Sequence, residues 1–325
     1  MRLAFAALAL LAGVSFGQAE PVAVTARPIT EFQIGREGTR FGPLEFVGGL
    51  ELTSGARDFG SFSALRFLGS DGRFMGVSDI GNWFFGRITR DAEGRPNGIA
   101  DFSLEPILDA LGDRSRAKQQ VDAESLTLSG DTAMVGFERN HRVVQYALKP
   151  SAMGKPLRKV PFLIPPRELR TNRGIEALVT APADGPLRGA LVAVTERSLD
   201  AQGNLFAAVL AGPRKGLFSV VRHDPFDVSD GAFLPNGDLL LLERSYSFPR
   251  GVGLRLRRIA GESIKPGAVV DGPILFTADM SYQIDNMEGL DVWRRADGRI
   301  AVSMISDDNQ SIFQRNLYLE FVLAE

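Results

Sequence analysis

The feature that most restricts the fold of this sequence is a repeated unit of two short strands separated by a tight turn. Five segments share the same order: a strand entry that often carries a carboxylate, a turn of Gly, Asp or Asn, and an apolar strand that ends in an acidic residue. The units begin at Ser63, Glu124, Glu176, Asp230 and Glu288, so they recur every 52 to 61 residues. Strand-built repeats of this period are typical of β-propellers, whose blades are four-stranded sheets.

The length of the chain limits the number of blades. About 305 of the 325 residues remain after the N-terminal segment described below, which corresponds to between five and six units of about 56 residues. Strand-like segments at 31–35 and 44–53 complete the last blade or supply a sixth, and pairing of N-terminal with C-terminal strands would close the ring. The main helical candidate is an insertion near residues 106–120. We therefore expect an all-β propeller of five to six four-stranded blades around a central channel, formed by one domain over residues 20–325.

The first 19 residues have the pattern of a secretory signal peptide. Arg2 supplies a positive charge, an apolar run extends from Leu3 to Val14, and small residues follow at Ser15, Gly17 and Ala19. The alternative is an N-terminal membrane anchor, but the run is shorter than the roughly 20 apolar residues that a spanning helix needs. We expect a periplasmic or secreted bacterial protein, a monomer with no membrane span after cleavage of the signal.

Composition excludes several kinds of chemistry. The chain has no Cys and only two His, His141 and His223, so cysteine nucleophiles, iron–sulfur clusters and a three-histidine zinc site are ruled out. The formal net charge of −2 lacks the basic excess that nucleic-acid binders carry. No phosphate-binding loop or dinucleotide fingerprint occurs, so we expect no organic cofactor.

Acidic residues recur at two positions of the repeated unit. If the first residue of each unit opens the innermost strand of its blade, Glu124, Glu176, Asp230 and Glu288 converge on one end of the channel, and only the first unit departs, with Ser63 in this place. The acidic residues that end the second strands should lie on the same rim; they are Asp79, Glu138, Glu196, Glu243, Asp307 and Asp308. Converging carboxylates repel one another unless positive charge lies among them. Ca²⁺, which takes six to eight oxygen ligands, is one such charge.

Arginine side chains are a second source of positive charge among these carboxylates, and the sequence supplies them directly. The dipeptide Glu-Arg occurs at 138–139, 196–197 and 243–244, and Arg173 precedes Glu176 by three residues. Arginine forks bind phosphate and carboxylate groups, while acids hold metals or transfer protons. The alternative is structural, because the same pairs would lock adjacent blades together. His141 follows closely after Glu138 and is either a general acid or base near the rim or a plain hydrogen-bonding residue.

Taken in order, these motifs resemble the phytase-like family, the exported bacterial group labelled "esterase-like activity of phytase". The segments that carry the resemblance are Asp122–Leu126, Phe137–Arg142, Asn172–Leu178, Leu242–Ser245, Asn286–Leu290 and Ser306–Asn309. The similarity runs from about Phe46 to the end of the chain. It implies a propeller fold, export, and hydrolysis of phosphate esters with Ca²⁺ by analogy with propeller phytases.

The leading functional hypothesis is a phosphoesterase-like hydrolase that acts on a small, phosphorylated substrate. Metal ions held by Glu124, Glu176, Glu288 and Asp307 would activate water and polarise phosphoryl oxygens. Asp79, Glu138, Glu196, Asp230, Glu243 and Asp308 are the further metal-ligand candidates. Arg139, Arg173, Arg197 and Arg244 would bind the charge of the substrate. Two rival hypotheses are a non-catalytic propeller that binds a ligand, a metal or a cell-envelope partner, and a lactonase-like hydrolase that uses Ca²⁺.

Overall fold

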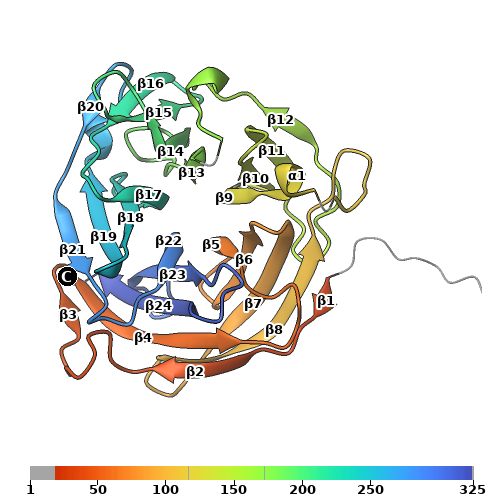
Figure 1. Ribbon diagram of the computed structural model, residues 1–325, viewed down its shortest axis with the longest axis vertical. Helices are drawn as coiled ribbons and strands as arrows, with labels where there is room; N and C mark the ends of the chain where they lie inside the picture. The colour runs from red at the N-terminus through yellow and green to blue at the C-terminus, as the bar shows by residue number, and fades with distance from the viewer. Residues whose placement is uncertain (1–18, 116, 172, 324–325) are drawn as a thin grey trace, which may run out of the picture.

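The computed structural model describes residues 19–115, 117–171 and 173–323, and these residues form a five-bladed β-propeller. Figure 1 shows the five sheets arranged around a central axis, with one strand of each sheet innermost. The structure confirms the all-β propeller and fixes the number of blades at five. The predicted signal peptide, residues 1–19, lies almost wholly outside the described residues.

The first four blades follow one another along the chain. From the channel outward, blade 1 contains β5 (Phe62–Phe67), β6 (Arg73–Ser78), β7 (Asn82–Arg90), β8 (Pro96–Pro106) and the short β1 (Glu20–Pro21). Blade 2 contains β9 (Ala123–Ser129), β10 (Thr132–Phe137), β11 (Arg142–Ala147) and β12 (Arg158–Val160). Blade 3 contains β13 (Ile175–Thr180), β14 (Leu191–Leu199), β15 (Leu205–Val209), β16 (Gly216–Val220) and β20 (Val269–Val270). Blade 4 contains β17 (Asp227–Phe233), β18 (Leu239–Ser247), β19 (Gly251–Ile259) and β21 (Ile274–Ala278).

Blade 5 joins the two ends of the described chain. Its inner strands are the C-terminal β22 (Asn286–Arg294), β23 (Ile300–Asp307) and β24 (Asn316–Leu323). The N-terminal β4 (Leu44–Thr53) pairs antiparallel with β24, and it is followed outward by β2 (Thr25–Ile29), with β3 (Arg40–Phe41) also on β4. The segment at 44–53 therefore completes the last blade, as one of the two sequence alternatives expected, and closes the ring.

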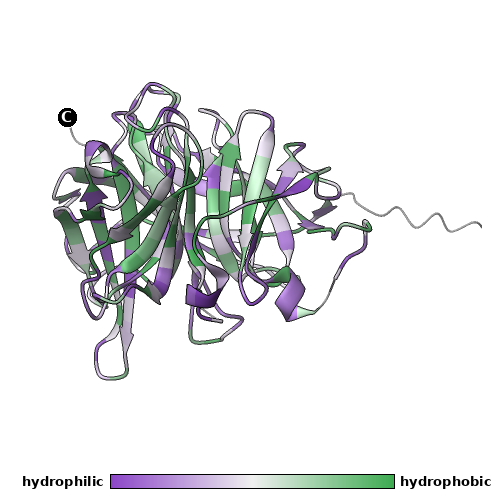
Figure 2. Cartoon of the chain, turned by 90° about the horizontal axis from the view of Figure 1, so that it is seen from above, coloured by the Kyte–Doolittle hydropathy of each residue, from purple (hydrophilic) through white to green (hydrophobic). Residues whose placement is uncertain are grey.

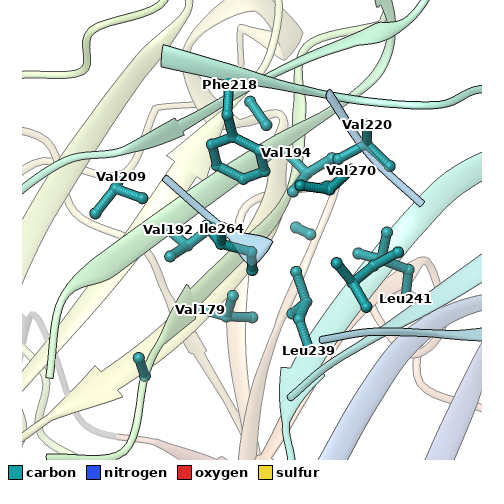
Figure 3. Close-up of a cluster of buried hydrophobic side chains, with 14 of the residues drawn as sticks. Val179, Val192, Val194, Val209, Phe218, Val220, Leu239, Leu241, Ile264 and Val270 are labelled. Atoms are coloured by element: carbon teal, nitrogen blue, oxygen red, sulfur yellow. The ribbon is translucent and has the colours of Figure 1, made fainter. Parts of the chain in front are cut away.

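The hydrophobic core lies between neighbouring blades. In Figure 3, Val192 and Val194 of β14 face Leu239 and Leu241 of β18, so blades 3 and 4 share one buried cluster. The residues of each strand alternate between the two faces of its sheet, and in a propeller both faces contact another blade. The inner strands β5, β13 and β17 are consequently buried along nearly their whole length. Figure 2 shows hydrophobic residues gathered in the strands and more hydrophilic residues in the loops.

Helical structure is sparse in the described part of the chain. The insertion expected near 106–120 is present, but its helix is a single turn, α1 (Lys118–Val121). Two 3₁₀ turns, η1 (Pro166–Glu168) and η2 (Gly261–Ser263), are the other helical elements described. Among the described residues, no helix has the length and apolar character that crossing a membrane requires.

Candidate functional site at one mouth of the channel

Each innermost strand contains a β-bulge at the same position. Where β5, β9, β13, β17 and β22 pair with the second strand of their blade, the ladder skips one residue; the five skipped residues are Ser63, Glu124, Glu176, Ser229 and Glu288. A bulge leaves its extra residue out of the ladder and re-aims the side chain, and bulges are over-represented beside active sites. The local fold thus presents three glutamates and two serines around the channel.

The second strand of each blade places one residue of a second ring opposite the position two residues before the bulge. In blades 1 to 3, the backbone N–H of Asp79, Glu138 and Glu196 donates to the carbonyl of the residue two before the bulge, at 2.8 to 3.0 Å. The corresponding pairs in blades 4 and 5 are Asp227 with Arg244 and Asn286 with Asp307. Four of the five ring positions therefore carry an acid, and blade 4 carries Arg244 instead.

The bulge and strand-end residues form one acidic mouth. Oxygen atoms of Glu138, Glu176 and Glu196 lie within 4.8 Å of one another, and these three residues are buried. A second group with the same spacing contains Asp79, Asp122 and Glu124. The two groups influence each other, since the carboxylates of Glu124 and Glu138 both help to raise the pKa of Glu176. We call these residues, with Glu288 and Asp307, the channel-mouth cluster.

The cluster holds more negative charge than its cations balance. Burial, followed by the neighbouring carboxylates Asp122 and Asp79, raises the pKa of Glu124 well above its usual value. Burial also raises the pKa of Glu138 to about 7 and that of Glu288 to about 7, the latter despite the opposing charge of Arg244. The pKa of Asp307 is raised by burial and by the charge of Glu288. Excess buried negative charge of this kind favours the binding of protons or a cation.

Two cations lie within the cluster itself. Arg244 approaches Glu288 at 3.2 Å and Glu196 at 3.5 Å, and its Nη1 donates to Asn286 at 2.9 Å. Burial alone would lower the pKa of Arg244, but the carboxylates of Glu288 and Glu196 raise it. Lys118 of α1 bridges Asp79 at 2.6 Å and Asp122 at 2.7 Å. The group around Asp79 and Asp122 therefore already contains a cation, whereas that of Glu138, Glu176 and Glu196 is flanked by arginines.

Three further arginines surround the mouth. Arg139, which has a left-handed backbone conformation with φ of 53°, donates its Nε to Asp122 at 2.7 Å. Arg197 donates its Nε to Asp227 at 2.8 Å. Arg173 reaches Glu196 only at 3.6 Å and Asp227 only at 3.8 Å, which is beyond hydrogen-bond distance. Arg173 is thus the predicted substrate-binding arginine that is paired least tightly with its neighbours.

His141 lies beside the acidic group of Glu138. Its Nε2 is 3.1 Å from the carbonyl of Arg170, while its Nδ1 is buried and has no hydrogen-bond partner among the described residues. Since a carbonyl only accepts, Nε2 carries the proton and Nδ1 has a free lone pair. Burial lowers the pKa of His141, which favours this neutral form. Gly174 allows the His141 ring to pack closely against the backbone: a Cβ at this position would lie 2.7 Å from the His141 ring and 3.4 Å from Glu138 Oε1.

Three of the predicted residues lie outside this arrangement. Asp230 follows the bulge residue Ser229 instead of occupying its place, and its carboxylate is fully buried in a bidentate pair with Arg66 at 2.8 and 2.9 Å. Glu243 precedes Arg244 and pairs with Arg257. The blade 4 alignment was therefore wrong by one residue, and neighbouring residues of a strand point to opposite faces.

Asp308 is the third predicted residue that lies outside the channel-mouth cluster. Its two oxygens accept hydrogen bonds from the Ser61 N–H at 3.0 Å and from Asn316 at 2.8 Å, so it links blades 5 and 1. Sequence reasoning missed Asp122, Asp227 and Asn286, although all three occupy the position two residues before a bulge. Lys118 belongs to the insertion, outside the repeats, and no sequence signal indicated it.

Comparisons with known proteins identify one matching family. Residues 57–310 match the model of the Phytase-like family, described as "Esterase-like activity of phytase". No curated protein matches the chain. Among solved structures, the PQQ-bound aldose sugar dehydrogenase from Streptomyces coelicolor is 13% identical, with a TM-score of 0.45 and coverage of 93% of this chain and 99% of that chain.

The endo-arabinase from Bacteroides thetaiotaomicron VPI-5482 is 12% identical, with a TM-score of 0.45 and coverage of 76% of this chain and 89% of that chain. The family match spans most of the chain and includes every member of the channel-mouth cluster. The chain therefore belongs to the Phytase-like family, and its fold is a five-bladed propeller.

Proposed function

We propose that the channel mouth is the active site of a phosphoesterase-type hydrolase that uses Ca²⁺. One observation carries the proposal: the channel mouth combines a tight group of buried carboxylates with arginine side chains that are partly exposed. Carboxylates alone suit a cation, and arginine forks suit phosphate oxygens. A phosphate ester bound through a hard cation needs both.

The residues present fit a calcium ion. The donors are all carboxylate oxygens, which hard cations prefer. One oxygen from each of Glu138, Glu176 and Glu196 lies within 4.8 Å of the others, close enough for the three to share one ion. Glu138, Glu176 and Glu196 would hold the ion, with Glu124 and Asp79 nearby. Bound there, calcium would neutralise the cluster and polarise a phosphoryl oxygen.

The chain's own residues supply the remaining steps. Arg173 and Arg244 bind and orient the anionic group of the substrate, because both side chains are partly exposed. Arg173 contacts Glu196 only at 3.6 Å, whereas Arg244 is already held by Glu288 at 3.2 Å. His141 Nδ1 accepts a proton from water, since its lone pair is free. Lys118 and Arg139 hold Asp122 in place, and Asn286 holds Arg244 through the hydrogen bond described above.

Substrate screening with matched variants tests this proposal. Purified protein should contain or bind Ca²⁺ and hydrolyse phosphomonoesters or phosphodiesters, and chelation should abolish turnover. Glu176→Gln should lower kcat at least about 100-fold, because it removes a proposed ligand of an ion whose charge stabilisation is worth several kcal/mol. Glu93→Gln, in the exposed turn between β7 and β8, is the matched control and should leave turnover unchanged. Turnover of carboxyl esters or lactones alone would reject the phosphoesterase assignment, and no metal with no turnover would leave the non-catalytic binder.

We also propose that the protein is exported as a monomer after removal of residues 1–19. The basis is the charge and apolar pattern of that segment. Cell fractionation and N-terminal sequencing of the product test the export, and light scattering tests the oligomeric state. An uncleaved product in the cytoplasm would contradict the first part of this proposal.

A further inference from the structure

A second cavity lies on the flank of blade 2, next to the channel mouth and separate from it. Its volume is about 380 Å³, within the range of small-molecule pockets. The floor is formed by Phe137, Val144 and Tyr146 of β10 and β11, together with Val121 of α1. Figure 1 places α1 beside β10 and β11. We call this cavity the blade 2 pocket.

The apolar surface continues from the floor to the rim. Phe137, Tyr146 and Val121 are almost fully buried, whereas Leu111 and Leu157 at the rim are 84% and 59% exposed. Apolar side chains that line a cavity and remain exposed at its edge favour an apolar ligand group, because binding removes their surface from water.

The charged residues of the pocket are mainly cations without acidic partners. Arg142, Arg158 and Lys159 line the cavity, and no carboxylate of the described residues forms an ion pair with any of them. The one acid in the lining, Asp109, is used within its own turn, where Oδ1 accepts the N–H groups of Leu111 and Asp113 at 2.9 and 3.0 Å. The pocket therefore has uncompensated positive charge above an apolar floor.

Arg142 is held in position for a ligand. Its guanidinium lies 3.9 Å from the centre of the Phe137 ring, and it donates to the carbonyls of Asn140 and Gln120. Carbonyls hold the guanidinium without neutralising it, so its charge is left for another group. Arg142 is partly buried, and an anionic group of a ligand would supply the counter-ion that this guanidinium lacks.

We propose that the blade 2 pocket binds a small amphiphilic anion: an aryl or medium-length alkyl group that carries one carboxylate, sulfonate or phosphate. The apolar part occupies the floor, and the anionic group pairs with Arg142, Arg158 and Lys159. The pocket also shares two segments with the channel mouth. Residues 118–122 supply Lys118 to the mouth and Val121 to the pocket, and residues 138–142 supply Glu138 to the mouth and Arg142 to the pocket.

Calorimetric titration of the full chain with three probes that share an eight-carbon chain and differ in charge tests the charge preference. Octanoate should bind at least about tenfold more tightly than 1-octanol, since a charge-assisted hydrogen bond contributes about that factor. Octyltrimethylammonium should not bind. Equal affinities for octanoate and 1-octanol would overturn the proposal.

Variants locate the site. Arg142→Gln should weaken octanoate binding at least about tenfold and leave the affinity for 1-octanol unchanged. Since Arg142 also contacts two carbonyls, the double variant Arg158→Gln/Lys159→Gln provides a second test on exposed residues, and it should weaken octanoate severalfold. Lys155→Gln, an exposed lysine of the same loop outside the lining, is the matched control and should bind octanoate as the parent protein does.

The channel mouth is the competing location for an anion. Arg173→Gln should leave octanoate binding unchanged, because Arg173 lies at the mouth and does not line the pocket. A loss on Arg173→Gln comparable to that on Arg142→Gln would place octanoate at the mouth and overturn the proposal. Unchanged binding in both pocket variants would overturn it as well.

Discussion

Gly174 is the residue of the channel mouth where a larger side chain would be felt most directly. Its N–H donates to Glu138 Oε1 at 2.5 Å, and its missing side chain allows the His141 ring to pack against it. A methyl group there would meet the His141 ring at a distance that real Cβ atoms do not show.

Gly174→Ala should therefore lower turnover by about tenfold or more, because small displacements of catalytic groups have large kinetic effects. Thermal unfolding should change far less, since the contact is with a side chain at the edge of the mouth. Gly38→Ala is the control, because no atom lies within 4 Å of a Cβ at this position. Equal turnover in both variants would show that the close packing of His141 on Gly174 has no role in the reaction.

Single carboxylates also determine how stability depends on pH. The pKa values of Glu138 and Glu288 are raised from 4.5 to about 7 in the folded protein. The folded state then binds more protons than the unfolded state between these values, so the free energy of unfolding falls as pH rises from about 4.5 to about 7. In chelator, denaturant unfolding should show this decline.

Calcium should reverse the trend, because bound metal requires deprotonated ligands and its affinity rises with pH. Glu288→Gln should flatten part of the slope in chelator. A free energy of unfolding that rises over this range in chelator would contradict the assignment of raised pKa values.

At the scale of elements, the repeated unit could be identified from sequence, but its alignment in blade 4 could not. Asp230-Gly231 resembles Glu124-Ser125 as an acid followed by a small residue, yet the bulge falls at Ser229. A shift of one residue moves a side chain to the other face of a strand, so Asp230 reaches Arg66 instead of the mouth. The same shift places Arg244 where Glu243 was expected.

The pairing of N-terminal with C-terminal strands in blade 5 should be required for cooperative unfolding. Removal of residues 1–54 takes away β2, β3 and β4 and leaves β24 unpaired along its outer edge. The shortened chain should lose cooperative unfolding and aggregate, since an exposed strand edge pairs with other chains. Removal of residues 1–22 is the control and should retain a cooperative transition. A cooperative transition in both chains would show that four blades and an open sheet suffice.

At the scale of the whole molecule, one buried ion pair links blades across the channel. Arg66 of blade 1 forms the bidentate pair with Asp230 of blade 4, and it also donates to the carbonyl of Leu290 in blade 5 at 2.7 Å. The N–H of Leu290 donates in turn to Asp230 at 2.8 Å. The channel is therefore bridged by this pair, at a depth below the channel-mouth cluster.

Arg66→Met should destabilise the protein by about 3–5 kcal/mol, because it leaves the buried Asp230 carboxylate without a counter-ion. The double variant Arg66→Met/Asp230→Asn should recover part of this loss. Chemical denaturation measures both, and turnover at the mouth should persist wherever the protein is folded. A double variant less stable than Arg66→Met would contradict the account of an uncompensated charge.

The propeller fold could be predicted from the sequence, because the strand period and the turn residues are local features. The glutamates of blades 2, 3 and 5 could be located as well, because in these blades the first acid of the repeated unit is also the bulge residue. The register of blade 4, the pairing of Asp230 with Arg66 and the position of Lys118 at the mouth became visible only in the folded molecule. These outcomes depend on contacts between residues far apart in the chain, and side-chain direction in a strand changes with a one-residue shift that composition does not reveal.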